Sequence, residues 1–229
     1  MKRRVNLLDA SRMTATTSGE TTRRVSTYFG EGGPFSYQKV RKLTPALLSA
    51  TLPYEVITAG LEKIKLDVAR NSNTKVAELL WECTRFRGRH FYPLDEVSYA
   101  VDREFNISLK PETVCAVDGL PNLIFLQPRK YPTLWPYNPA FMRRVLEDAY
   151  IPDYYENARF WLVDTEAREG GDRHMTLVDL QSVAPMNDRE FIRRMASLRA
   201  AWRLYLRTPR PKKDRPTKPD DRQSDFGFE

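Results

Sequence analysis

The sequence is poor in the residues that usually bind transition metals. It contains two cysteines, Cys83 and Cys115, and two histidines, His90 and His174. The cysteines have no CxxC spacing, which argues against a zinc ribbon and fits a reducing compartment. Two histidines are too few for a multi-histidine metal centre.

Long apolar segments are missing as well. No apolar run approaches the roughly 20 residues that span a bilayer. The first residues, MKRRVNLLDASRM, contain no apolar stretch followed by a small-residue cleavage site. We therefore expect a soluble, cytoplasmic protein.

Several common functional motifs do not occur. The sequence has neither GxxxxGK[ST] nor a GxGxxG after a strand, which argues against the common nucleotide-binding folds. It has no GxSxG, and no cysteine with an evident histidine partner, which argues against the common hydrolases. Neither a helix-turn-helix spacing nor an RNP-like strand is evident, so the standard nucleic-acid-binding modules are not supported.

The sequence does divide into one domain and two tails. Residues 1–25 carry six Lys/Arg against two acids, and residues 208–229 carry six against five. The net charge of +7 therefore leaves 7 − 4 − 1 = +2 for residues 26–207. We predict disordered tails at 1–25 and 208–229 around a single domain, with weak attraction for polyanions rather than a dedicated groove. The final DFGFE is either a solvated end or a short docking peptide.

Hydrophobic spacing predicts a mixed α/β fold. Apolar residues at helical spacing and capping signals predict six helices, at about 44–53, 54–70, 74–87, 94–105, from 139 onward and 187–207. Alternating apolar residues predict strands from about 107 through 130, at 158–167 and at 173–183. We expect a mixed central sheet of about four strands with helices packed on it.

The segment Val114–Lys130 is predicted to be a β-hairpin with polar residues at both ends. Asp118 ends the first strand, and Gln127, Arg129 and Lys130 close the second. A carboxylate facing a polar, basic cluster can hold a divalent metal beside a phosphate. The alternative is an ordinary hairpin in which Asp118-Gly119 forms the turn.

The order helix, hairpin, helix, strand over residues 74–180 resembles the PD-(D/E)XK, restriction-endonuclease-like family. The resemblance places the family's first acid at Asp118 and its second motif at Gln127-Pro128-Arg129. It implies Asp118, Gln127, Arg129 and Lys130 as catalytic residues. Glu78 or Glu82 corresponds to the metal-binding helix acid that some members use with the first acid.

Two replacements separate the chain from the usual pattern of that family. Gln127 stands in place of the second acid, and Arg129 in place of the usual lysine. Lys130 is one residue out of phase, which turns it to the opposite face of a strand. The resemblance therefore implies a non-cleaving relative, or an atypical nuclease that uses Mg²⁺.

Two aspartates interrupt later apolar strands. Asp164 lies in FWLVDTE and Asp179 in TLVDLQ. If the two strands pair around REGGDR, the carboxylates lie close enough for a metal or for acid–base chemistry. The alternative places both on a solvent face.

The last predicted helix carries two separate stripes. An apolar stripe faces the sheet, and an adjacent arginine stripe could contact a phosphate backbone or an acidic protein surface. The arginine stripe, taken as a nucleic-acid-binding surface, comprises Arg189, Arg193, Arg199, Arg203 and Arg207.

The sequence thus leaves two functions open. The first is a nucleic-acid-associated protein on a nuclease-like scaffold, with DNA or RNA as partner. The alternative is a non-enzymatic protein–protein interaction through the arginine-rich last helix and the aromatic segment 131–139, YPTLWPYNP. Neither function involves a membrane.

Overall fold

The computed structural model describes residues 3–30, 36–129, 136–150, 157–166 and 172–208. Its elements follow in the order β1 Arg3–Asn6, α1 Leu7–Met13, α2 Ser18–Gly30, α3 Gln38–Ser49, α4 Tyr54–Thr58, α5 Asp67–Trp81, β2 Phe91–Tyr92, β3 Val97–Ala100, β4 Phe105–Leu109, β5 Thr113–Val117, β6 Leu120–Gln127, α6 Pro139–Tyr150, β7 Arg159–Asp164, β8 Thr176–Asp179, the 3₁₀ turn η2 Leu180–Ser182 and α7 Asp188–Arg207. Among the described residues, no helix combines the length and apolar composition needed to cross a membrane.

The strands form two mixed sheets. The larger sheet has the order β2-β5-β6-β7-β8, in which β6 and β7 are parallel and all other neighbours are antiparallel. Helix α6 makes the crossover between the two parallel strands. The smaller sheet has the order β1-β4-β3. The prediction of a mixed α/β fold is confirmed, although the strands form two sheets rather than one.

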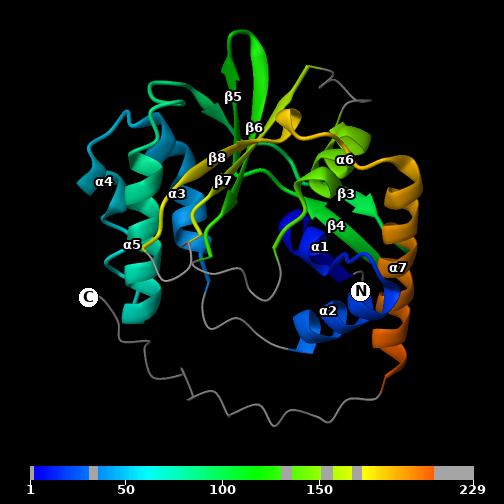
Figure 1. The fold of residues 1–229 in the computed structure, drawn as a ribbon. Coiled ribbons are helices and arrows are strands. Elements are labelled where there is room, and N and C mark those ends of the chain that lie inside the picture. Colours follow the sequence, from blue (N-terminus) through cyan, green and yellow to red (C-terminus); the bar gives the residue numbers. More distant parts are fainter. Residues whose placement is uncertain (1–2, 31–35, 130–135, 151–156, 167–171, 209–229) are drawn as a thin grey trace.

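Each face of the larger sheet is covered by its own hydrophobic core. Leu123, Phe125 and Leu162 point to one face, where α1, α6, α7 and the smaller sheet pack. Ile124 and Leu126 alternate with them and point to the other face, toward α3, α4 and α5. Figure 1 shows the two helical groups on opposite sides of the sheet. Because side chains alternate along a strand, the central pair β6–β7 is buried on both faces.

The N-terminal segment is not a tail. Residues 3–6 add β1 to the smaller sheet in parallel with β4, and residues 7–13 and 18–30 form α1 and α2. Val5, Leu7 and Met13 are buried in the first core. The prediction of disorder for residues 1–25 is therefore wrong for residues 3–25. The short strand and the two helices bury their apolar side chains largely against elements distant in sequence, such as β4 and α7. The C-terminal segment 209–229, including DFGFE, lies outside the described residues.

Residues 94–105 were also predicted incorrectly. Their apolar residues recur at helical spacing, but Val97–Ala100 form β3 and pair with β4 in antiparallel fashion. Val97 and Tyr99 alternate with more exposed neighbours, as a strand at a sheet edge requires. Short apolar runs satisfy both periodicities, and here pairing with β4 decided between them.

The helices around α5 have different boundaries from those predicted. The predicted 54–70 helix is interrupted: Tyr54–Thr58 form α4, residues 59–66 are not helical, and α5 begins at Asp67 and runs through Asn71-Ser72-Asn73. The Asn73 side chain is buried, donates to the Ala69 carbonyl and accepts from the Val40 amide of α3. The boundary predicted between residues 70 and 74 therefore falls inside one helix, and Asn73 joins that helix to α3.

Both cysteines are free and buried. Burial raises the pKa of the Cys115 thiol to about 11, and burial also raises that of Cys83. Between about pH 9 and 11 the unfolded chain releases the Cys115 proton while the folded chain retains it, so stability should fall as pH rises through this range. We expect Cys115→Ala to flatten this fall in urea titrations. A thiol reagent at pH 8 should label both residues only in denaturant, and rapid labelling of the folded protein would contradict the prediction.

Candidate functional site

The β5–β6 hairpin is an ordinary hairpin at its turn. Val117 pairs with Leu120, and Asp118 and Gly119 both have positive φ values, 53° and 76°. This two-residue connection is the type that favours Asp-Gly. The Asp118 side chain is exposed. Asp118 therefore turns the chain, as the alternative interpretation held.

The residues predicted to share a metal lie apart. Gln127 ends β6, seven residues beyond the turn, which separates it from Asp118 by about 23 Å at the usual rise of a strand. Glu78 pairs with Lys75 on the surface of α5, 2.9 Å between Oε2 and Nζ, and Glu82 is exposed at the end of that helix. Within the described residues no group of three His, Cys, Asp or Glu could hold a metal. The predicted metal site is not formed.

Gln127 and Arg129 instead belong to a buried charge cluster. This cluster, at the carboxyl ends of β6 and β7, consists of Asp9, Arg12, Gln127, Arg129 and Glu166. Arg129 donates to both Asp9 carboxylate oxygens, at 2.6 and 3.0 Å. Arg12 and the Gln127 amide both donate to Oε1 of Glu166. Lys130 lies outside the described residues.

Asp9 is the centre of the cluster. Its side chain is 2% exposed, and it also accepts hydrogen bonds from Tyr28 Oη at 2.9 Å and from Asn6 Nδ2 at 2.7 Å. The carboxylate therefore receives donors from α2, from the start of α1 and from the chain after β6. Asp9 fastens the N-terminal segment to the larger sheet.

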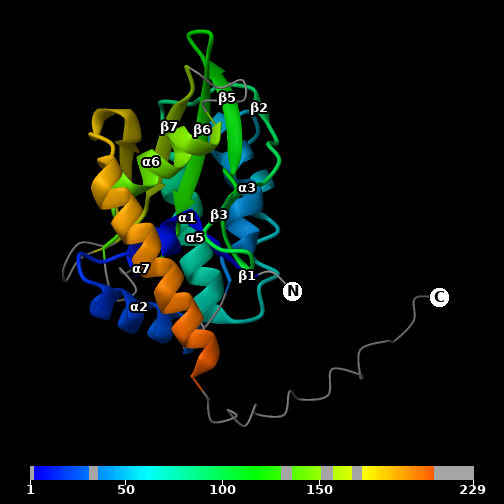
Figure 2. The same ribbon diagram turned by 90° about the vertical axis from the view of Figure 1, so that its right-hand side faces the viewer.

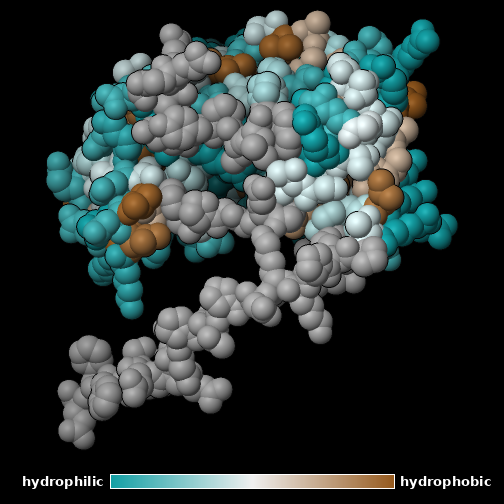
Figure 3. All heavy atoms as spheres, turned by 60° about the horizontal axis from the view of Figure 1, so that its bottom comes forward, coloured by the Kyte–Doolittle hydropathy of each residue, from teal (hydrophilic) through white to brown (hydrophobic). Residues whose placement is uncertain are grey.

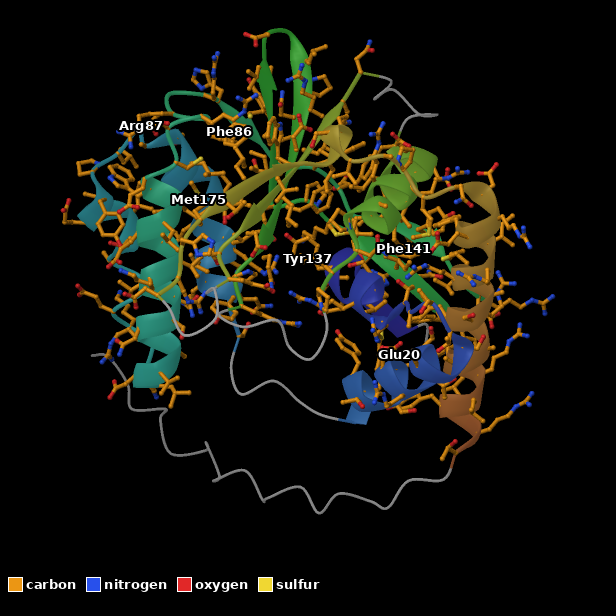
Figure 4. The ribbon with its side chains drawn as sticks, viewed as in Figure 1. Glu20, Phe86, Arg87, Tyr137, Phe141 and Met175 are labelled. Carbon is orange, nitrogen blue, oxygen red and sulfur yellow. The ribbon has the colours of Figure 1, made fainter. Side chains whose placement is uncertain are left out.

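Asp164 and Tyr137 extend the cluster on the β7 side. Tyr137 Oη donates to Asp164 Oδ2 at 2.8 Å, and the Glu166 amide donates to Oδ1 at 3.0 Å. Burial, together with the Asp164 charge, raises the pKa of Glu166, and the Arg12 guanidinium opposes that rise. Figure 4 shows Tyr137 near the middle of the molecule. Of the predicted aromatic segment 131–139, residues 131–135 lie outside the described residues.

Asp164 and Asp179 do not form a carboxylate pair. Strands β7 and β8 are antiparallel neighbours, as expected, but Asp164 lies opposite Thr176 and Asp179 lies opposite Trp161. Three residues of strand separate them, about 10 Å. Asp179 caps the following turn by accepting from the Gln181 amide at 3.0 Å.

The buried charge cluster is therefore a fastening between α1 and the sheet. Each of its guanidinium and carboxylate groups lies against a group of opposite charge. Asp9 and Arg12 were not predicted as site residues because they lie in the segment assigned to a tail. The available signal was Leu7, Ala10 and Met13, whose i, i+3 spacing is that of one face of a short helix.

Helix α7 begins and packs as predicted. The Asn187 side chain accepts from the Glu190 amide at the first turn. Its inner face carries Trp202, which stacks on Phe105 of β4 with ring centroids 4.8 Å apart and also contacts Phe29 of α2. Leu206 is 50% exposed, because it lies in the last turn at the border of the packed sector.

Beyond its first turn, the outer face of α7 carries no acid; the exposed Asp188, the first residue of the helix, lies in the same arc. Between Arg189 and Arg207 ten exposed residues fall within an arc of about 160°. They are Arg189, Ile192, Arg193, Ala196, Arg199, Ala200, Arg203, Leu204, Leu206 and Arg207. The nearest acids, Asp188 and Glu190, sit in the first turn and pair with Arg144 and Arg194. Figure 2 shows α7 crossing the front of the molecule with no other element over it.

The five arginines differ in how far they are already engaged. Arg199 Nε donates to the Val101 carbonyl at 2.8 Å, and Arg203 Nε donates to Asp102 Oδ2 at 2.7 Å. Arg193 approaches Glu190 at 3.9 Å. Within the described part of the chain, Arg189 and Arg207 form no ion pair. In Figure 4, nitrogen-tipped side chains project outward along α7.

Comparison with known proteins corrects the family assignment. Residues 8–206 match the model of a family described as the sliding clamp-binding bacterial toxin SocB. No curated protein and no solved structure matches the chain. The match overturns the resemblance to the PD-(D/E)XK family, together with the nucleic-acid function inferred from it. That resemblance depended on a common order of elements and on an Asp118 that serves only as a turn residue. Since the match covers well over half of its 229 residues, the chain belongs to the SocB family of sliding clamp-binding bacterial toxins.

Proposed function

We propose that this protein binds the DNA sliding clamp and acts as a toxin through that interaction. The observation that carries the proposal is the extent of the family match. It runs from the second residue of α1 to the penultimate residue of α7 and so includes both hydrophobic cores. The alternative drawn from the sequence, a protein–protein interaction, is the function that the match favours.

Toxicity through binding requires no chemical step. A stable complex between folded proteins buries about 1,200–2,000 Å² of surface. A protein that occupies such an area on the clamp excludes the other proteins that need the same area. The severity of the toxicity should then depend on the ratio of toxin to clamp, because the two are linked by mass action.

Direct binding is the first test. Purified full-length protein should form a complex with purified clamp that survives size-exclusion chromatography, with a dissociation constant measurable by surface plasmon resonance. An unrelated protein of similar net charge, near +7, serves as the control. The proposal is wrong if the clamp and this protein elute separately and no binding is measured at concentrations of about 100 µM, far above the range of specific complexes.

The second test is made in cells. Expression of the protein in a bacterial host should arrest growth, and overproduction of the clamp should relieve the arrest by supplying free binding sites. Overproduction of an unrelated protein should have no effect. Growth arrest that clamp overproduction leaves unchanged would show that toxicity has another target.

A further inference from the structure

We propose that the outer face of α7 is the surface that docks on the sliding clamp, and that it meets an acidic area of the clamp. This inference rests on the proposed function and assigns it to particular residues. The composition of the outer face of α7 is unusual for a solvated helix.

Solvated helix faces mix acids with bases, whereas beyond Asp188 this face has five arginines, three large aliphatic residues, two alanines and no acid. Protein interfaces are enriched in arginine and depleted in Lys, Glu and Asp. Arginine is also among the residues that contribute most to binding when a complex excludes water around it. The composition therefore fits a surface that another protein covers.

The aliphatic residues argue for a protein rather than a nucleic acid. Ile192 is 66% exposed and Leu204 is 51% exposed, and both lie among the arginines. Aliphatic side chains stabilise a complex when another apolar surface removes them from water, whereas a phosphate backbone offers them no apolar surface. Figure 3 shows small hydrophobic areas among hydrophilic side chains at the right-hand edge of the molecule, the side on which α7 lies.

The charge of the face indicates the character of the partner. Arg189 and Arg207 form no ion pair within the described residues, and Arg193 has only a distant acid, Glu190 at 3.9 Å. Arg199 and Arg203 are anchored through Nε, which fixes their direction. Guanidinium groups held in a row on a rigid helix match carboxylates on a facing surface.

The position of α7 in the family match also supports this surface. The match ends at Leu206, so α7 lies inside it up to its penultimate residue while the segment 209–229 lies outside. The property that names the family is expected in residues that the family shares. The helix is held rigidly from behind by Trp202, Phe105 and Phe29, which lowers the entropic cost of docking.

The test compares two sets of three substitutions in the full-length protein. The first, Arg189→Ala, Arg193→Ala and Arg207→Ala, removes three charges from the outer face of α7. The control, Lys39→Ala, Lys42→Ala and Lys63→Ala, removes three exposed charges from α3 and the loop after α4, on the other side of the molecule. We expect the first set to weaken clamp binding by about tenfold or more and the control by less than about twofold.

Further measurements separate the possible causes. Thermal melting should show the same Tm for the wild type and for both sets. All six side chains are exposed, and alanine is a good helix former. Affinity of the wild type should fall as salt rises, and the first set should show a weaker salt dependence. Ile192→Ser should weaken binding by about tenfold without changing the salt dependence.

Several results would overturn the inference. Clamp binding by the first set at wild-type strength removes α7 as the docking surface while leaving the proposed function intact. If the control set loses as much clamp affinity as the first set, the loss reflects net charge and not the position of the arginines. If the first set loses binding to a short DNA duplex but still binds the clamp, the arginines contact nucleic acid and not the clamp. Loss with Phe226→Ala and Phe228→Ala but not with the α7 set assigns docking to the C-terminal sequence. A wild type that does not bind the clamp contradicts both proposals.

Discussion

Replacing Asp9 with alanine is expected to lower the free energy of unfolding by about 3–5 kcal/mol. The substitution removes the acceptor for both terminal nitrogens of Arg129 and for Tyr28. It also leaves Arg12, which is 3% exposed and has Nε and Nη1 without hydrogen-bond partners among the described residues, with Glu166 as its remaining ion-pair partner. The buried Arg12 guanidinium then has one carboxylate instead of two to offset its desolvation, and Arg129 loses the carboxylate that binds both of its terminal nitrogens.

Urea denaturation followed by circular dichroism measures this effect. The control is Glu96→Ala, which breaks the exposed ion pair between Arg4 of β1 and Glu96. Exposed pairs contribute only about 0–1 kcal/mol. Both substitutions remove one carboxylate, so the difference reports the burial of Asp9 together with its larger number of bonds. Equal losses in the two variants would show that the buried charge cluster does not fasten α1 to the sheet.

Replacing Trp202 with alanine is expected to cost about 3–5 kcal/mol, the usual range for a large aromatic residue in a core. Trp202 is fully buried, stacks on Phe105 at 4.8 Å and on Tyr205 at 5.6 Å, and contacts Phe29 at 5.1 Å. It is therefore a central residue of the packing of α7 on both α2 and the smaller sheet. Its loss leaves a cavity where these three elements meet.

Two further variants sharpen this prediction. Leu204→Ala, two residues away and half exposed, should change stability by no more than about 0.5 kcal/mol. Trp202→Phe should lose less than Trp202→Ala, because it keeps a ring in the core and removes the Nε1–H, which has no hydrogen-bond partner among the described residues. Urea denaturation followed by circular dichroism measures the stability of all three variants. A Trp202→Ala protein as stable as the Leu204→Ala protein would contradict the packing role.

The elements predicted best were those whose signals are local. The Asp-Gly turn, the cap at Asn187 and the apolar stripe of α7 each depend on residues within a few positions of one another. Local signals of this kind survive in the tertiary structure because backbone geometry alone imposes them. The mixed α/β class followed from the order of these elements.

The predictions that failed depended on distant partners. Whether Val97–Ala100 formed a strand depended on β4, and whether residues 3–25 were ordered depended on β4 and α7. The predicted metal site failed for the same reason, since one end of β6 carries the turn and the other carries Gln127. Two residues that are close in sequence can lie at opposite ends of a strand, as Asp118 and Gln127 do.

The sequence by itself determined the mixed α/β class, a hairpin within 114–130 and a final helix with separate apolar and arginine stripes. Each is predicted by hydrophobic periodicity, turn residues or capping residues, which act over a few positions of the chain. Only the tertiary structure decided that Asp9, Arg12, Arg129 and Glu166 meet in one buried charge cluster, and that the arginines of α7 share their face with exposed aliphatic residues. Burial and charge pairing depend on which elements pack together, and that arrangement is a property of the whole chain.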